Sequence, residues 1–140
     1  NLPNVVAVHV PTTTVGALMA VISMKKTAEG QPRQAIMAAL GTEFYVKTIV
    51  VVDDDVDIFN LSDVMWAVIT RTRADDDIVY IPGAMGAILD PTSDPETHTL
   101  TKVGIDATKP AGRDFAERLT ISPEQRAHVR GIIERAGVRL

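Results

Sequence analysis

The chain has 140 residues, of which 46% are hydrophobic, and this is enough to bury one ordinary core. The formal net charge of -4 argues against broad electrostatic binding of a phosphate backbone, so we expect no nucleic-acid partner. There is no cysteine, which excludes disulfides, thiolate catalysis and cysteine-ligated metal centres. No apolar run approaches the roughly 18 residues that would span a membrane, so we expect a soluble, cytoplasmic protein with no membrane partner.

The start of the chain is unusual. Residue 1 is Asn1 rather than Met, and a strand pattern begins almost at once, at Val5. We interpret residues 1–140 as a single domain that is a fragment of a longer protein. N-terminal processing or a missing tag would produce the same appearance.

The first half of the chain alternates between strand and helix patterns. Residues 5–10 and 18–24 are expected to be strands, and Pro32 opens a helix that Gly41 can end. Residues 47–52 form a third strand, in which four consecutive β-branched residues require that both faces be covered. This pattern is typical of a sheet with helices on both sides.

The alternation continues after a short acidic turn. Asn60 or Ser62 can cap a helix that ends at the basic residues Arg71 and Arg73, and residues 78–81 form a short strand that Pro82 ends. We therefore expect the α/β class, as a three-layer αβα domain with a mixed, largely parallel sheet.

The last third of the chain contains a long loop and a terminal helix. Residues 83–101 carry turn-forming residues throughout, so we expect an exposed and functional loop, followed by a short strand within residues 102–109. A helix then begins at a Ser122 cap and runs to about residue 136, with Ile132 and Ile133 facing the core.

The acidic turn is the most conspicuous polar feature, because four aspartates fall within five residues at the end of a buried strand. It does not fit a calcium loop, since the sixth and twelfth positions counted from Asp53 are Ile58 and Val64 rather than glycine and glutamate. It does not fit a phosphorylated receiver domain either, because the chain ends before the required lysine. The four residues are Asp53, Asp54, Asp55 and Asp57.

Two interpretations of this turn remain open. Asp53 and Asp55 are suitably placed for the metal-binding Asp-x-Asp of a nucleotide-sugar transferase. Alternatively, the aspartates cap the following helix and pair with Arg71 or Arg73. The rest of the sequence contains no complete catalytic set, and a stand-alone oligomerisation module is a third possibility.

Three segments together resemble a known family. The strings MAVISMKK, VVVDDDVDIFNLSDVMWAVITR and KVGIDATKP, in this order within residues 5–110, resemble the C-terminal domain of the UbiD family of prenylated-FMN-dependent, reversible decarboxylases. The resemblance implies a carboxy-lyase that acts on an aromatic or α,β-unsaturated carboxylic acid. Its cofactors would be prenylated FMN, a manganese-like divalent metal and potassium.

The resemblance also implies what this part of the enzyme does. The catalytic residues, most flavin contacts and the divalent-metal ligands lie in the preceding flavin-binding domain of the family, so we expect no catalytic residue in this chain and no activity from it alone. The C-terminal domain contributes a homodimer or higher homo-oligomer interface and part of the substrate wall.

Four residues acquire roles through this resemblance. Arg71 and Asp106 match positions that help to hold a monovalent cation, and Ile88 and Leu89 match the substrate-facing region. Without the resemblance, Arg71 would be interpreted as part of an ion pair at the helix end and Asp106 as a turn cap. Ile88 and Leu89 would be interpreted as packing residues. The family's flavin-contacting lysine is left unassigned, because Gly41 lies near that point and Lys47 only a few residues later.

Overall fold

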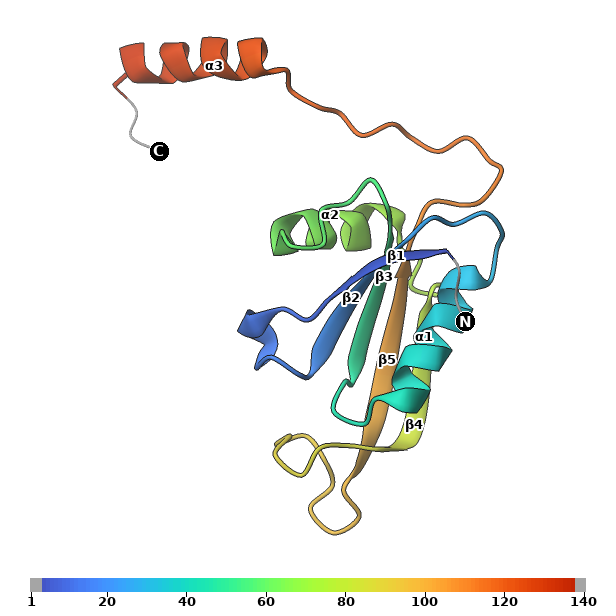
Figure 1. The fold of residues 1–140 in the computed structure, drawn as a ribbon. Helices are drawn as coiled ribbons and strands as arrows, with labels where there is room; N and C mark the ends of the chain where they lie inside the picture. The colour runs from blue at the N-terminus through green and yellow to red at the C-terminus, as the bar shows by residue number, and fades with distance from the viewer. Residues whose placement is uncertain (1–3, 138–140) are drawn as a thin grey trace.

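A five-stranded mixed sheet organises the protein, for which the computed structural model describes residues 4–137. The strand order is β1-β2-β3-β5-β4. Two central pairings, β2 with β3 and β3 with β5, are parallel, whereas the edge strands β1 and β4 pair antiparallel (Figure 1). The strands are β1 (Val5–His9), β2 (Met19–Met24), β3 (Thr48–Asp53), β4 (Ile78–Met85) and β5 (Thr99–Ala107).

Two helices cover the two faces of this sheet, so the expected three-layer α/β fold is confirmed. Helix α1 (Gln31–Thr42) packs on one face and α2 (Leu61–Arg71) on the other (Figure 1). A short 3-10 turn, η1 (Thr12–Thr14), links the first two strands, and α3 (Pro123–Arg135) follows the sheet. None of the helices within residues 4–137 is long and apolar enough to cross a membrane.

The run of β-branched residues in β3 explains the two cores. Ile49 and Val51 point to the α1 side, whereas Val50 and Val52 point to the α2 side, and all four are almost fully buried. Burying such a side chain is worth roughly 1.5–3 kcal/mol. The strand therefore stabilises both layers at once.

The prediction was wrong about the bounds of the last two strands. β4 does not end at Pro82 but continues to Met85 through an irregularity between Ile81 and Ala84, where Gly83 adopts a φ of 66°. Proline is tolerated here because β4 is an edge strand. Since β5 also begins earlier than predicted, the loop is shorter and spans residues 86–98.

Helix α3 has the predicted cap but not the predicted packing. Ser122 and Gln125 form the expected capping box, but the helix has no buried residue and Ile132 is 48% exposed. Residues 111–122 have no helix or strand and carry α3 away from the sheet (Figure 1). The expectation that Ile132 and Ile133 face the core was therefore wrong.

The close approach of α1 to β5 generates a stability prediction at Gly104. A Cβ atom at this position would lie 2.0 Å from Cγ2 of Ile36, which is fully buried. Gly104→Ala should lower the free energy of unfolding by about 1–3 kcal/mol, because the core cannot accept the methyl group without shifting α1. Denaturant titration measures this change.

Gly41 provides the matched control. It lies near the end of α1, and a Cβ there would meet nothing within 4 Å. Gly41→Ala should leave the stability unchanged or raise it by up to about 1 kcal/mol. Equal effects of the two substitutions would contradict the packing described for Gly104.

Candidate functional site

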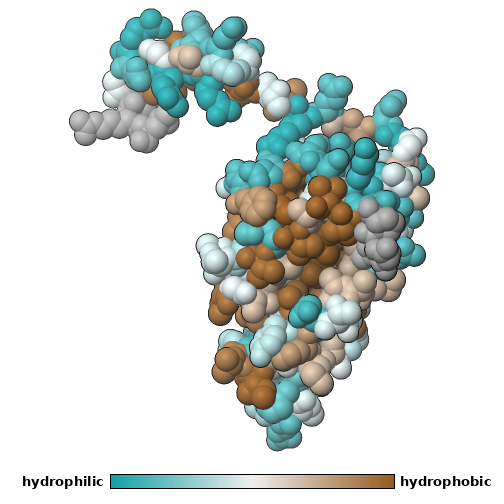
Figure 2. Space-filling view, viewed as in Figure 1, coloured by the Kyte–Doolittle hydropathy of each residue, from teal (hydrophilic) through white to brown (hydrophobic). Residues whose placement is uncertain are grey.

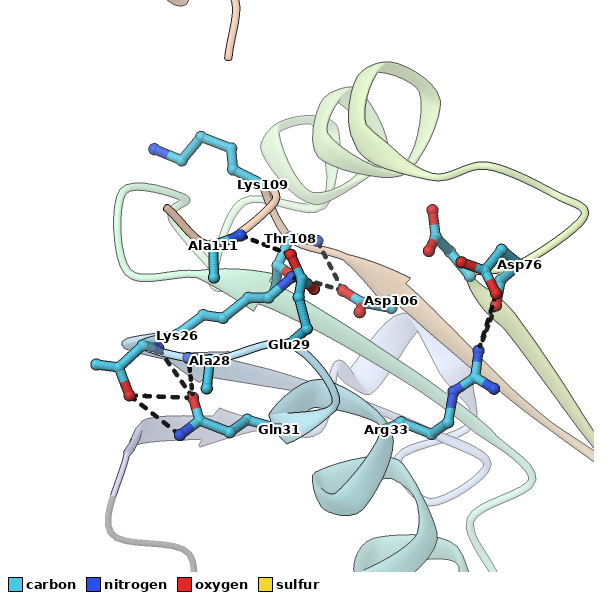
Figure 3. Close-up of polar contacts among 12 residues, drawn as sticks. Lys26, Ala28, Glu29, Gln31, Arg33, Asp76, Asp106, Thr108, Lys109 and Ala111 are labelled. Carbon is cyan, nitrogen blue, oxygen red and sulfur yellow. Dashed lines mark hydrogen bonds and ion pairs between the residues drawn. The ribbon is translucent and has the colours of Figure 1, made fainter. Parts of the chain in front are cut away.

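A polar cavity of about 660 Å³ lies at the carboxyl end of the parallel strands, where α/β sheets commonly bind ligands. Arg71 and Asp106, the two residues predicted to hold a cation, both line it. Figure 3 shows part of its wall, with Lys26, Glu29, Asp106 and Thr108 close together. The complete lining is Lys26, Glu29, Gly30, Arg33, Thr70, Arg71, Thr72, Arg73, Asp76, Asp77, Asp106, Thr108, Pro110, Arg113 and Phe115.

The buried guanidinium of Arg71, at the end of α2, binds two aspartates of the acidic turn. Nη1 of Arg71 lies 2.7 Å from Oδ2 of Asp53 and 2.8 Å from Oδ1 of Asp55, and Nη2 lies 2.8 Å from Oδ2 of Asp55. The Arg71 side chain is only 2% exposed. Of the two interpretations of the turn, this geometry favours structural pairing with an arginine.

Lys109 strengthens the same cluster from the exit of β5. Its backbone N–H donates to Oδ2 of Asp53 at 2.8 Å, and its Nζ donates to Oδ2 of Asp55 at 3.0 Å. Sequence reasoning missed this residue, although it stands in the family-like string KVGIDATKP. The cluster therefore joins β3, α2 and the segment after β5.

The two carboxyl groups in the cluster respond differently to their surroundings. Hydrogen bonds from Arg71 lower the pKa of Asp55 to about 2, with a further contribution from Lys109. Burial raises the pKa of Asp53, although the N–H of Lys109 and the charge of Arg71 oppose this shift. Asp55 is thus the firmly ionised partner of Arg71.

Asp106 is the carboxylate that Arg71 does not neutralise. Its Oδ1 accepts bonds from the N–H and the hydroxyl of Thr108, at 3.0 and 2.6 Å. Within residues 4–137 it forms no ion pair, and burial raises the pKa of its carboxyl group. A cation placed in the adjoining cavity would offset this burial.

Ile88 and Leu89 lie at the opposite end of the sheet from this cavity. They occupy the loop between β4 and β5 and are 76% and 90% exposed. Since β5 runs from this loop to Ala107, at about 3.3 Å per residue the two ends lie roughly 25 Å apart. The structure therefore separates the predicted substrate-facing residues from the predicted cation residues.

An ion pair between Lys47 and the buried Asp90 holds this loop in place. Nζ of Lys47 lies 2.7 Å from Oδ2 of Asp90 and 2.9 Å from Oγ1 of Thr92, and Asp90 is only 3% exposed. Figure 2 shows a small hydrophobic patch at the lower left of the molecule, next to a hydrophilic lower tip. Anchoring Asp90 inward leaves the two residues before it facing outward.

A second cavity, of about 420 Å³, is apolar. It lies beside β1 and β2 on the α1 side, where Figure 2 shows a hydrophobic area on the surface. Val8, Val10 and Tyr45 contribute to it. Among the described residues, Glu43 and Tyr45 are the lining residues with polar side-chain groups.

The described residues do not form a metal centre of their own. Residues 4–137 contain no group of three or more histidine, aspartate or glutamate side chains arranged to hold a metal ion. The oxygens of Asp53 and Asp55 face Arg71 and Lys109, which weakens the transferase interpretation.

Comparison with known proteins identifies the family. Residues 1–107 match the family model of the 3-octaprenyl-4-hydroxybenzoate carboxy-lyase C-terminal domain. The chain belongs to the UbiD family. Its relatives are UbiD-type decarboxylases, so the resemblance inferred from the sequence is confirmed.

Two curated relatives illustrate the range of this family. The chain is 44% identical over 106 residues to the anhydromevalonate phosphate decarboxylase of Methanocaldococcus jannaschii, covering 74% of this chain and 25% of that protein. It is 37% identical over 134 residues to the phenolic acid decarboxylase of Escherichia coli O157:H7, covering 91% of this chain and 28% of that protein. The chain thus spans about a quarter of the length of these relatives.

The solved structures agree with this family membership. The UbiD-class enzyme HmfF from Pelotomaculum thermopropionicum, in complex with FMN, matches with a TM-score of 0.80 and 38% identity, over 89% of this chain and 28% of that chain. An evolved dimeric form of HmfF in complex with prFMN matches with a TM-score of 0.68 and 35% identity, over 86% of this chain and 24% of that chain.

The depressed pKa of Asp55 predicts a pH-dependent contribution to stability. Because its folded-state pKa is about 2 against an ordinary 3.8, its stabilisation is present above pH 4 and is lost as the pH falls toward 2. Asp55→Asn should therefore lower the free energy of unfolding at pH 7 but have little effect near pH 2. Urea titrations at the two pH values measure this difference.

Asp54→Asn is the control for this prediction. Asp54 is exposed and makes no ion pair within residues 4–137, so its replacement should change stability little at either pH. An Asp55→Asn effect of equal size at pH 7 and pH 2 would contradict the ion-pair explanation.

Proposed function

We propose that this chain is the C-terminal domain of a prenylated-FMN-dependent, reversible decarboxylase that acts on an aromatic or α,β-unsaturated carboxylic acid. The observation that carries the proposal is the family match over residues 1–107. The FMN and prFMN complexes of HmfF support the cofactor, and the two curated relatives support decarboxylation as the reaction. When bound, the prenylated flavin would supply the covalent chemistry that releases or adds carbon dioxide.

The chemistry itself is assigned to the flavin-binding domain that precedes this domain in the family. The described residues fit this division, because the buried charged groups have partners within the domain. Asp53, Asp90 and Arg71 are engaged in ion pairs, and Nζ of Lys102 donates to the backbone carbonyls of Leu40 and Glu43. The catalytic residues, the divalent metal and most flavin contacts are thus expected outside residues 1–140, and the chain alone is expected to be inactive.

The loop between β4 and β5 would supply one wall of the substrate pocket. Ile88 and Leu89 are exposed and apolar, and the Lys47–Asp90 pair fixes the loop that carries them. Covered by the flavin-binding domain, such a wall would exclude water and favour loss of a neutral molecule from a charged acid. This fits both aromatic and unsaturated aliphatic acids, which present apolar carbon frameworks.

The polar cavity would hold a monovalent cation, which we propose to be potassium. Asp106 fits this role because it lines the cavity, is partly buried and carries no ion pair within residues 4–137. The guanidinium of Arg71 has no lone pair to offer a cation and is bonded to Asp53 and Asp55. We therefore assign Arg71 a positioning role and Asp106 the direct contact.

We further propose that the domain assembles the enzyme into at least a homodimer. The evolved dimeric form of HmfF and the exposed apolar side chains on this domain support this role. A cytoplasmic location is also proposed, consistent with the absence of cysteine.

The wall assignment predicts a change of specificity on replacing Leu89. In the full-length enzyme, Leu89→Ala should change the ratio of kcat/KM for two competing acids by roughly 10-fold, since a few methylene contacts in a pocket have about this effect. The flavin content, measured by absorbance, should stay unchanged, because this side chain is not assigned to the cofactor.

The matched control is Val15→Ala, which truncates another highly exposed aliphatic residue, 82% exposed, between β1 and β2. It should alter neither the specificity nor the flavin content. An unchanged substrate ratio for Leu89→Ala, or a loss of flavin, would count against the proposed wall.

A further inference from the structure

The segment that follows β5 is attached to the domain near its start. Residues 109–118, here called the strap, contain no helix or strand. Their conformation therefore depends on contacts with other elements. The N–H of Ala111 donates to Oε1 of Glu29 at 2.7 Å (Figure 3). Glu29 also forms an ion pair with Lys26, which lies just after β2, so the start of the strap is fastened beside that strand.

The strap forms part of the wall of the polar cavity. Pro110, Arg113 and Phe115 line this cavity together with Asp106. The remaining lining residues belong to β5, to the two packed helices and to the connections of the sheet. If the strap moved away, the side of the cavity that it covers would therefore open to solvent.

Arg118 fastens the end of the strap to two residues of α2. Its guanidinium forms an ion pair with Asp63, and the guanidinium carbon lies 4.1 Å from the ring centre of Trp66. These two partners are three residues apart and so lie on one side of the helix. A guanidinium placed above an indole ring gains a cation–π interaction in addition to the ion pair. The side chain of Asp63 is only 11% exposed, and the hydrogen bond from Arg118 lowers the pKa of its carboxyl group.

Trp66 connects this attachment to the buried arginine at the end of α2. The guanidinium carbon of Arg71 lies 4.9 Å from the ring centre of Trp66. Arg71 is bonded to Asp53, which also accepts the N–H of Lys109 at the start of the strap. The contacts form a closed circuit, which leads from one end of the strap to the other through Asp53, Arg71 and Trp66. Both ends of the strap are therefore coupled to the same group of side chains.

We propose that Arg118 is a positioning residue that holds the strap over the polar cavity and so retains the cation bound there. Arg118 is not among the residues that line the cavity, and it acts through Pro110, Arg113 and Phe115, which are. Loss of its contacts would increase the share of molecules in which the cavity is open. The proposal rests on the cation site proposed above and adds the element that controls access to it.

Proteolysis tests whether Arg118 holds the strap. Trypsin would be applied to the native full-length enzyme, and cleavage after Arg113 would be followed by the mass of the products. Arg118→Ala should increase the rate of this cleavage by roughly 10-fold, because loss of an ion pair and a cation–π contact has about this effect on a local opening equilibrium.

Glu117→Ala is the matched control, because it truncates the neighbouring charged side chain. Glu117 is exposed and forms no ion pair within residues 4–137, so its replacement should leave the rate of cleavage unchanged. Equal rates of cleavage for the two variants would overturn the proposal.

Potassium titration tests whether the strap retains the cation. The unfolding temperature of the full-length enzyme would be measured against the potassium chloride concentration, with tetramethylammonium chloride keeping the ionic strength constant. Arg118→Ala should raise the potassium concentration at half-maximal effect by roughly 10-fold, because an open strap lowers the population of the binding-competent state. Arg118→Lys, which keeps the positive charge, should restore most of the affinity, and Glu117→Ala should match the wild type.

The outcomes separate the strap from the cation site itself. A purely structural role of Arg118 would lower the unfolding temperature of Arg118→Ala equally at every potassium concentration. An unchanged half-maximal concentration would thus overturn the proposal and leave the cation site intact. A wild type whose unfolding temperature does not respond to potassium would overturn both.

Discussion

The charge balance at the carboxyl end of the sheet depends on Arg71. Asp53 is the last residue of the buried strand β3 and Asp55 follows it, and without a cation between them the two carboxylates would repel each other at the edge of the core. Arg71 reaches Asp53 and Asp55 from the last residue of α2, while Lys109 reaches them from the exit of β5. A buried pair of this kind adds little net stability, but losing one partner would leave an unpaired buried charge, which typically costs about 3–5 kcal/mol.

This arrangement decides which carboxylate remains for a ligand. Asp53 and Asp55 are bonded to Arg71, whereas Asp106 lines the cavity and, among residues 4–137, only Thr108 is bonded to its side chain. The far end of the sheet differs, because its anchored loop presents Ile88 and Leu89 to the outside. On the proposed assignments, the charged end of the domain would hold the cation and the apolar end would contact the substrate, with strand β5 running between them.

Local chemistry was sufficient to predict much of the fold. The β-branched run in β3 predicted a strand buried on both faces, and Ser122 with Gln125 predicted the start of α3, because both signals act over only a few residues. Pro82 misled the prediction, since whether a proline ends a strand depends on whether that strand lies at an edge. Ile132 and Ile133 misled it for a related reason: an apolar stripe shows that a helix needs a partner but not which partner it has.

The candidate site was only partly predictable for the same reason. Arg71 was expected as a possible partner of the acidic turn, but the role of Lys109 depends on β5 pairing beside β3, a contact between residues far apart in sequence. The roles of Asp106 and Leu89 came from family resemblance. Their separation at opposite ends of the sheet became clear only from the strand order.

The response of the full-length enzyme to potassium tests this account most directly. The unfolding temperature would be measured in potassium chloride and in tetramethylammonium chloride at equal ionic strength, for the wild type, Asp106→Asn and the control Asp54→Asn. We predict that potassium stabilises the wild type and the control but not Asp106→Asn, because only a ligand of the folded state raises stability. Equal unfolding temperatures of the wild type in the two salts, or an undiminished potassium effect in Asp106→Asn, would contradict it.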